Sequence, residues 1–283
     1  MKILVLGANG MAGHTISMYF LENGHDVTTY TVAPFGFGKN VVGDAFETEK
    51  LKSLVLSDNF DAVINCIGLL NQIADSNPEK AIFLNSYLPH FIASVLNGST
   101  TKFIQMSTDC VFAGNTGPYF ENSLKDGRTF YDRTKALGEV DYNQHVTFRN
   151  SIIGPDMNVL GIGLFNWFMK QSGTINGFTN AIWTGVTTLT LAKAMEKGIQ
   201  GNLTGLYNLV NNESISKYEL VKLFNTHFRN NELSVLADER LNLDKSLRNT
   251  RTDFGFQVPS YEQMIVEMKE WVNNHPDLYP HYF

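Results

Sequence analysis

The segment YDRTK carries a tyrosine and a lysine, Tyr131 and Lys135, four residues apart. On a helix this spacing places both side chains on one face. Reduction of a ketone by hydride leaves negative charge on the ketone oxygen. The reaction therefore needs a hydroxyl that donates a proton and a cation that keeps this hydroxyl acidic enough. The pKa of tyrosine is about 10, and a lysine one helical turn away is expected to lower it. The pair is either such a donor with its cation or two surface side chains.

A second hydroxyl is needed to position the carbonyl, and the segment MSTDCVF offers Ser107 and Thr108 at the end of an apolar run. Open parallel sheets bind their ligands at the carboxyl ends of the strands, which is where this pair is expected to lie. A Ser-Thr pair after a strand is also a common cap or turn. Its catalytic interpretation therefore depends on the tyrosine and lysine downstream.

A glycine-rich turn, GANGMAG, directly follows the first apolar run. Its glycines Gly7, Gly10 and Gly13 are spaced as G-x-x-G-x-x-G, which allows a tight turn and close approach of the backbone to a pyrophosphate. The phosphate charge would lie at the N-terminus of a helix that begins near Met11. A bare structural turn is the alternative, but the position between a strand and a helix favours nucleotide binding.

The elements that must position these motifs alternate along the first half of the chain. Strands are predicted over residues 2–7, 26–31, 61–68, 102–107 and 146–154, and helices over 11–23, 47–57, 78–97 and 131–143. Several of these strands are apolar on both faces, as a parallel sheet covered by helices on both sides requires. The prediction is an α/β fold with a Rossmann-type doubly wound parallel sheet.

The character of the sequence changes near residue 155, where glycines and aromatic residues interrupt short runs. Further on, helices are predicted over 187–198 and 216–228, with a strand over 205–210 between them. We expect an NAD(P)-binding domain over residues 1–150 and a smaller, mainly substrate-binding lobe over 151–283, with a soft boundary and some interleaving. The aromatic tail WVNNHPDLYPHYF is expected to cover either this lobe or a partner subunit in a homodimer.

Composition excludes several classes of partner. The chain has 22 basic and 28 acidic residues, a net charge of −6, so no global positive field attracts nucleic acid or anionic lipid. Cys66 and Cys110 are neither at metal-ligand spacing nor numerous enough for a disulfide framework. We therefore expect no bound metal and a cytoplasmic location. The apolar run before Gly7 is short for a secretory signal, and no uninterrupted apolar run of about 18 residues predicts a membrane span.

The second predicted strand ends in TTYTVAPFGFGKN, without the acidic residue that often binds the ribose 2′-hydroxyl of NAD. Lys39 in this segment is expected to meet a 2′-phosphate, which favours NADPH while leaving NADH possible; a solvated lysine is the alternative. Asp44 would lie where a third strand presents it to the adenine. A helix N-cap before residues 47–57 explains Asp44 equally well.

Five segments in order, GANGMAGH, DAVINCIG, STDCVFAG, YDRTKALGE and FRNSIIG, resemble extended short-chain reductases of the dTDP-4-dehydrorhamnose reductase type, from residue 1 to about 210. The resemblance implies NAD(P)H-dependent reduction of the C4 keto group of a nucleotide-activated 4-keto-6-deoxyhexose, a step that feeds cell-surface polysaccharide synthesis. It implies the catalytic set Thr108, Tyr131 and Lys135. The cofactor residues it implies are Gly7, Asn9, Gly10, Met11, Ala12, Cys66, Ile67, Gly68, Asn85 and Ser107, with a plain buried amide as the alternative for Asn85.

Departures from the family pattern concern the substrate. Cys110 replaces the tyrosine of STDYVF, RNSI replaces RTSW, and AIWTGVTT replaces DQ-x-G-x-PT. The substrate is therefore expected to be dTDP-4-dehydrorhamnose or a UDP-linked 2-acetamido-2,6-dideoxy-4-hexulose. Asp109 and Cys110 are expected beside the sugar. Asn150 would bond an acetamido group or cap the backbone, and Trp183 would stack on a base or sugar or belong to the core of the lobe. Arg248, from the cluster Lys245, Arg248 and Arg251, would bind the diphosphate or lie in solvent.

Two other functions compete with this one. The same superfamily contains non-catalytic regulatory subunits, including the beta subunit of methionine adenosyltransferase, but retention of Thr108, Tyr131 and Lys135 together argues against that function. Nucleotide-sugar epimerases and dehydratases also share the superfamily. Dehydratases usually carry an Asp-Glu pair after the threonine, whereas Asp109 is followed here by Cys110.

Overall fold

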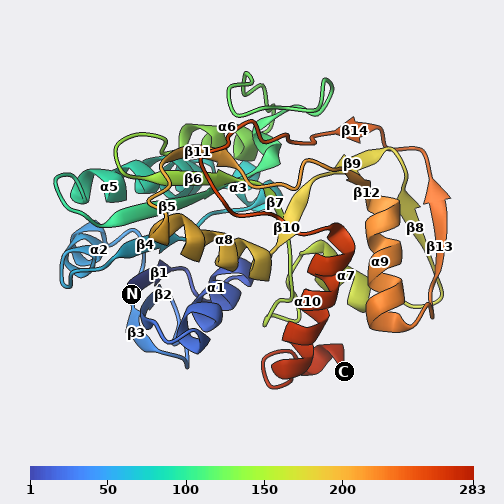
Figure 1. Ribbon diagram of the computed structural model, residues 1–283, viewed down its shortest axis with the longest axis horizontal. Helices are drawn as coiled ribbons and strands as arrows, with labels where there is room; N and C mark the ends of the chain where they lie inside the picture. The colour runs from blue at the N-terminus through green and yellow to red at the C-terminus, as the bar shows by residue number, and fades with distance from the viewer.

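The alternating strands and helices of the first half build a parallel sheet of seven strands in the computed structural model, which describes residues 1–283 (Figure 1). The strand order is β11-β6-β5-β4-β1-β2-β3, and every neighbouring pair is parallel. The strands are β1 Lys2–Leu6, β2 Asp26–Thr31, β3 Lys39–Val42, β4 Ala62–Asn65, β5 Lys102–Ser107, β6 Val146–Arg149 and β11 Gly205–Asn208. The predicted doubly wound α/β fold is confirmed.

Side chains of β1 alternate between the two faces of the sheet, as the two-residue period of a strand requires. Ile3 and Val5 belong to one hydrophobic core, whereas Leu4 and Leu6 belong to a separate core on the other face. The helices that cover the sheet are α1 Met11–Glu22, α2 Thr48–Val55, α5 Leu88–Val95, α6 Phe130–Leu137 and α8 Thr188–Gln200. Helices therefore cover both faces, which explains why the strands are apolar on both sides.

Several predicted elements have different bounds. The helix predicted over 78–97 is a succession of α4 Pro78–Ala81, a π-helical segment Ile82–Tyr87 and α5, preceded by α3 Asn71–Ser76. The helix predicted over 131–143 spans Phe130–Leu137, and Gly138 is its C-cap. Gly138 lies against the Asn85 backbone, since a Cβ there would be 1.8 Å from the Asn85 carbonyl oxygen. The strand predicted over 146–154 divides into β6 and β7 Ser151–Ile153. The third strand, expected before Asp44 without stated bounds, is β3.

The C-terminal half forms a lobe of short strands and helices and also returns to the large sheet. Its paired strands are β7 with β10, β9 with β12 and β14, and β8 with β13. These elements are α7 Leu164–Met169, β8 Thr174–Phe178, β9 Ala181–Trp183, β10 Gly185–Thr187, β12 Ile215–Ser216, α9 Lys217–Arg229, β13 Ser234–Asp238, β14 Leu243–Asp244 and α10 Tyr261–Asn274. Since α8 and β11 also come from this half, the two parts of the chain interleave.

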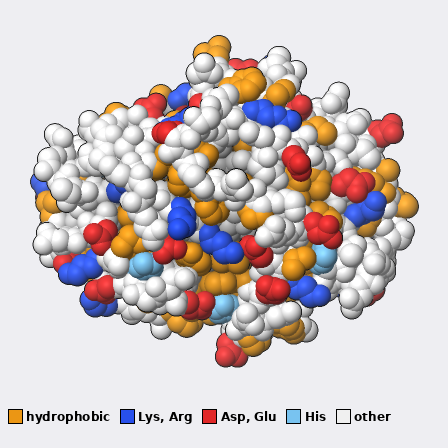
Figure 2. All heavy atoms as spheres, in the orientation of Figure 1, with side chains coloured by type: hydrophobic (Ala, Val, Ile, Leu, Met, Phe, Trp, Pro, Cys, Tyr) orange, Lys and Arg blue, Asp and Glu red, His pale blue; other side chains and the backbone are white.

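The surface shows no grouping of charges of one sign on the face drawn in Figure 2, where acidic and basic side chains are interspersed. This mixture agrees with the small net negative charge of the sequence. None of the helices combines the length and the apolar character needed to cross a membrane.

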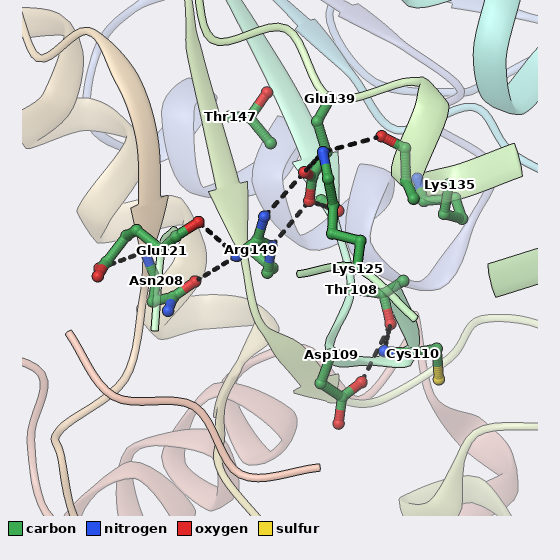
Figure 3. A network of polar contacts seen from close by, with 12 residues as sticks. Thr108, Asp109, Cys110, Glu121, Lys125, Lys135, Glu139, Thr147, Arg149 and Asn208 are labelled. Carbon is green, nitrogen blue, oxygen red and sulfur yellow. Dashed lines mark hydrogen bonds and ion pairs between the residues drawn. The ribbon is translucent and has the colours of Figure 1, made fainter. Parts of the chain in front are cut away.

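A buried ion pair joins the carboxyl ends of three strands to the end of α6 (Figure 3). The Glu139 carboxylate accepts hydrogen bonds from Arg149 Nε and Nη2, both at 2.8 Å, and the two side chains are each 1% exposed. It also accepts a hydrogen bond of 2.7 Å from the Ser107 hydroxyl and one of 2.9 Å from Lys125 Nζ. Arg149 Nη1 donates to Asn208 Oδ1 at 3.4 Å. Strands β5, β6 and β11 are thereby held in register with α6.

The charge of Glu139 depends on these donors. Burial raises the pKa of this carboxyl, but the hydrogen bonds and charge of Arg149, together with Ser107 and Lys125, lower the pKa below its ordinary value. A carboxyl whose pKa is lower in the folded state stabilises the protein above its unfolded pKa, and this stabilisation is lost as the pH falls through the folded pKa.

We expect Arg149→Leu to lower the free energy of unfolding by about 3–5 kcal/mol at neutral pH, because it leaves a buried carboxylate without its main partner. Lys125→Met is the matched control: its side chain is 37% exposed, and its loss should cost less than about 1 kcal/mol. Urea denaturation measures both.

Wild-type stability should also decline below about pH 4.3, the unfolded pKa of glutamate. This decline should be steeper than the decline in the stability of Arg149→Leu. Equal losses in the two variants would contradict this account of the ion pair.

Candidate active site

The N-terminus of α6 is fixed by three side chains, and this fixes Tyr131 in its first turn. The Thr129 hydroxyl accepts the Asp132 N–H, and the Asp132 carboxylate accepts the Thr129 N–H, both at 3.1 Å, which forms a capping box. Asp75 Oδ1 accepts the Tyr131 N–H at 3.1 Å. The Tyr131 side chain is 6% exposed and packs near Cys110.

Thr108 lies just beyond β5, beside this tyrosine. Its hydroxyl donates to Asp109 Oδ1 and accepts the Cys110 N–H, both at 3.1 Å (Figure 3). Burial raises the pKa of Tyr131, the neighbouring Cys110 and Asp109 raise it further, and the Thr108 hydroxyl opposes them. The structure thus brings together Thr108 and Tyr131, which are 23 residues apart in the sequence. Tyr131 is protonated at neutral pH.

Lys135 lies one turn further along α6 and is 8% exposed. Its Nζ donates a hydrogen bond of 2.7 Å to the Met106 carbonyl oxygen at the end of β5. Burial lowers the pKa of Lys135 to about 8, although the charges of Glu139 and Cys66 oppose the shift. The pKa of Tyr131 is raised and not lowered as predicted, because burial of the phenol is the largest influence on it. The Lys135 ammonium group is instead held at the Met106 carbonyl.

The glycine-rich loop has the close contacts that its spacing predicts. Gly7 has a φ of +84°, and a Cβ on Gly13 would be only 2.2 Å from the Gly7 carbonyl oxygen. Gly10 is exposed and precedes α1 without a side-chain cap, and the first turn of α1, which includes Met11 and Ala12, has no acidic residue. Helix α1 therefore offers free N–H groups and the positive end of its dipole to an anion.

The loop after β4 lies directly against this turn. A Cβ on Gly7 would be 3.0 Å from Ile67 Cγ1 and 3.2 Å from the Cys66 carbonyl carbon. The burial of Cys66 raises the pKa of its thiol to about 12, while the charge of Lys135 opposes this shift. Asn9 Nδ2 donates to the Pro34 carbonyl oxygen at 3.5 Å, but its buried Oδ1 has no partner. An open helix N-terminus, bare glycines and an unpaired amide oxygen fit a dinucleotide.

Asn85 has a supporting role that differs from the prediction of a cofactor contact. Its Oδ1 accepts the Leu69 N–H at 2.9 Å, and its Nδ2 donates to the Leu69 carbonyl at 3.0 Å and to Thr134 Oγ1 at 3.2 Å. Gly68 lies against the same amide, since a Cβ there would be 3.0 Å from Asn85 Oδ1. Because the amide is fully engaged, it holds the loop after β4 against α6 instead of binding a ligand.

Lys39 lies at the opposite end of the sheet from the glycine-rich turn, so the prediction that it contacts a 2′-phosphate is wrong. It is the first residue of β3 and pairs with Asp26, the first residue of β2, at 3.0 Å. The glycine-rich loop follows the carboxyl end of β1, whereas Lys39 lies at the amino ends of the parallel strands. Asp44 follows the carboxyl end of β3, is exposed, and accepts the Phe46 N–H at 3.0 Å in a turn.

Two further predicted contacts have other partners. The Ser107 hydroxyl donates to Glu139, so it supports the sheet and is not free for a cofactor. Trp183 is 4% exposed and packs on Tyr261 with ring centroids 5.7 Å apart. It belongs to the hydrophobic core and not to a stacking surface, because Gly185 also lies against its ring.

The remaining predicted substrate residues differ in their surroundings. Burial raises the pKa of Asp109, opposed by the charge of Lys245, and burial raises the pKa of Cys110 to about 12. Asn150 Nδ2 donates to the Ser151 carbonyl at 3.2 Å, while its buried Oδ1 has no partner. Arg248 Nη1 is likewise buried without a partner. The basic cluster does not form one site, because Arg251 pairs with Asp253 and donates to the carbonyls of Thr204 and Leu206.

Sequence reasoning missed two residues that support the site, Glu139 and Asp75. Glu139 follows Lys135 at the i+4 spacing that makes helical neighbours, so this signal was present in the sequence. Asp75 had no signal, because its contact with Tyr131 depends on the packing of α3 against α6.

Together, the doubly wound sheet, the glycine-rich turn and the Thr-Tyr-Lys constellation define an extended short-chain reductase fold. The family model for the RmlD substrate binding domain matches residues 1–270, and the chain belongs to this family.

Individual relatives agree with this membership. A probable low-salt glycan biosynthesis reductase, Agl14, of Haloferax volcanii is 33% identical over 144 residues, which cover 49% of this chain and 48% of that protein. The match therefore spans about half of that relative. Methionine adenosyltransferase 2 subunit beta of Xenopus laevis is 26% identical over 239 residues, covering 77% of this chain and 70% of the relative. A dTDP-4-dehydrorhamnose reductase from Bacillus anthracis, solved in complex with NADP, shares the fold with a TM-score of 0.80 and 20% identity over 94% of this chain and 98% of that one.

The glycines of the loop predict two separable effects. A Cβ on Gly10 would meet only the Gly7 carbonyl oxygen, at an ordinary 3.5 Å. Gly10→Ala should therefore keep the wild-type melting temperature and weaken NADPH binding about tenfold or more, because the methyl group faces the pyrophosphate. Gly13→Ala should lower the melting temperature, since its methyl group collides with the backbone. Thermal unfolding and cofactor titration test both; unaltered NADPH affinity in Gly10→Ala would contradict this position for the pyrophosphate.

Proposed function

We propose that this protein reduces the C4 keto group of a nucleotide-activated 4-keto-6-deoxyhexose with NAD(P)H. The observation that carries the proposal is the meeting of Thr108, Tyr131 and Lys135 at the carboxyl end of β5. Lys135 also lies close enough to Cys66 to affect the pKa of its thiol, and Cys66 adjoins Gly7 of the glycine-rich turn. A ketone at Thr108 and Tyr131 would thus lie beside a dinucleotide held by this turn.

The residues of the chain divide the work of the reduction. A bound reduced nicotinamide supplies the hydride. The raised pKa of Tyr131 keeps its proton on the phenol at neutral pH, so the phenol can donate this proton to the ketone oxygen as charge develops there. The Thr108 hydroxyl holds the same oxygen in position. Lys135, protonated below about pH 8, stabilises the phenolate that remains.

One unpaired polar atom favours a UDP-linked 2-acetamido-2,6-dideoxy-4-hexulose over dTDP-4-dehydrorhamnose, and a second suits the diphosphate that both substrates carry. Asn150 Oδ1 is a buried acceptor without a donor, which suits an acetamido N–H. Arg248 Nη1 is a buried donor without an acceptor, which suits a phosphate oxygen. We propose that such a substrate satisfies both groups, and that the product enters cytoplasmic synthesis of cell-surface polysaccharide.

NADPH is the proposed cofactor, with NADH as the alternative. The argument from Lys39 no longer applies, since this lysine lies at the opposite end of the sheet. What supports NADPH is the segment after β2, residues 32–38, which contains no acidic residue to bind a ribose 2′-hydroxyl or to repel a 2′-phosphate.

A non-catalytic regulatory subunit is the second candidate. Its support is the broad match to the methionine adenosyltransferase subunit, which covers 77% of this chain. Catalysis is favoured because the proton donor, its hydroxyl neighbour and the lysine are all present and buried together. A net reductase is preferred to an epimerase or dehydratase because Asp109 is followed by Cys110 instead of a second carboxylate.

Turnover separates these candidates. Purified protein with NADPH or NADH and a panel of dTDP- and UDP-linked 4-keto-6-deoxy sugars should consume the reduced nicotinamide, with NMR identifying the product. Tyr131→Phe should lower kcat by about 10²–10⁴-fold, because it removes only the donated proton. Tyr87→Phe is the control, since Tyr87 is 50% exposed. Cofactor binding without turnover by any substrate of the panel would support the regulatory subunit.

The proton on Lys135 predicts the alkaline limit of the reaction. The value of kcat/KM should fall above about pH 8, as the free enzyme loses this proton and with it the charge beside Tyr131. Lys135→Arg, whose guanidinium has a pKa above about 12, should retain some activity and move this limit upward. A pH profile measured at low substrate concentration tests the assignment, and an unmoved limit in Lys135→Arg would assign it to another group.

A further inference from the structure

The C-terminal tail, residues 275–283, follows α10 (Figure 1) and packs against α1 of its own chain, where Tyr279 meets His14. Tyr279 is fully buried, and its hydroxyl is 2.8 Å from His14 Nε2 and 3.0 Å from Trp271 Nε1. The other ring nitrogen of His14, Nδ1, lies 3.0 Å from the Gly10 carbonyl oxygen. A continuous chain of hydrogen bonds thus runs from α10 through the tail to the glycine-rich turn.

The direction of each bond follows from its chemistry. The Gly10 carbonyl can only accept, so His14 Nδ1 carries the proton and Nε2 is an acceptor. The Tyr279 hydroxyl must then donate to Nε2, and its oxygen accepts the Trp271 N–H. His14 stays neutral in this arrangement, because burial lowers its pKa to about 4. Each of the three side chains is fixed by the next.

This chain controls the orientation of one peptide group. The Gly10 carbonyl and the Met11 N–H belong to the same planar peptide unit and point in opposite directions. When His14 holds the carbonyl, the Met11 N–H must point outward from the N-terminus of α1, where the proposed pyrophosphate lies. The same carbonyl also accepts the His14 backbone N–H at 3.0 Å, so its position is determined twice.

A second branch of the tail holds the loop of residues 156–163 and the first turn of α7, which contains Asn166. The Tyr282 hydroxyl accepts the Asp156 N–H and donates to Asn166 Oδ1, both at 3.0 Å. Asn166 Nδ2 in turn donates to three carbonyls of this loop, the nearest being Gly161 at 2.7 Å. The loop adjoins the glycine-rich turn, since a Cβ on Gly163 would be 3.0 Å from Met11 Sδ.

We propose that the tail is a positioning element of the cofactor site, in which Tyr279 orients the Gly10–Met11 peptide and Tyr282 orients the loop that faces it. The inference rests on the proposed function, since it requires that the glycine-rich turn bind a dinucleotide. Both tyrosines of the aromatic tail contact their own chain.

The test is Tyr279→Phe, which removes one hydroxyl and keeps the ring in the core. We expect the Kd for NADPH and its KM to rise about 3- to 10-fold, with kcat at saturating NADPH unchanged. Tyr19→Phe is the matched control. Tyr19 lies on α1, as His14 does, but its hydroxyl donates to Glu196 at 2.6 Å, away from the glycine-rich turn. Tyr19→Phe should alter the melting temperature without altering the Kd.

A double-mutant cycle with His14→Gln provides a second measurement. If the two residues act through one chain, the double variant should bind NADPH about as weakly as the weaker single variant. Equal Kd values for wild type and Tyr279→Phe, or fully additive effects in the cycle, would overturn the inference. Absence of NADPH binding by the wild type would instead contradict the proposed function, so the two failures are distinguishable.

Discussion

The bidentate pairing of Glu139 with Arg149 is the interaction on which the site depends. It brings the ends of β5, β6 and β11 against the end of α6. The residues of the proposed catalytic set lie directly after β5 and on α6. A buried ion pair contributes little net stability when both charges are desolvated, but it tolerates only one geometry. Its value here is that it specifies the relative position of a strand end and a helix.

Burial has different consequences for the proton donor and for the cation beside it. Removal from water disfavours every charged form, so it raises the pKa of Tyr131 and lowers that of Lys135. In the protein alone the Tyr131 phenol therefore keeps its proton, and Lys135 donates a hydrogen bond to the Met106 carbonyl. The two groups are already in position for reduction. Transfer of the Tyr131 proton depends on the negative charge that develops on the ketone oxygen during the reaction.

The candidate site also shows which residue contacts a local sequence pattern can predict and which it cannot. Gly7, Gly10 and Gly13 could be interpreted from spacing, because the contacts that require glycine are made within the turn itself. Lys39 could not, since its distance from the turn depends on where β3 begins, and that strand has no strong apolar pattern. Asn85 was assigned to the cofactor by the family resemblance, with a buried amide as the alternative. Trp183 was expected either to stack on a base or sugar or to belong to the core. Packing against Leu69, Thr134 and Tyr261 uses these groups instead.

The sequence by itself determined the doubly wound sheet, the glycine-rich turn and the pairing of Tyr131 with Lys135, because strand and helix periods and i+4 spacing are properties of neighbouring residues. Only the tertiary structure decided which polar groups remain free. Ser107 and Asn85 are satisfied by partners 32 and 16 residues away, whereas Asn150 and Arg248 keep unpaired atoms. The contact between His14 and Tyr279 joins residues separated by 265 positions. Such pairings depend on how the chain closes on itself, and no local pattern encodes them.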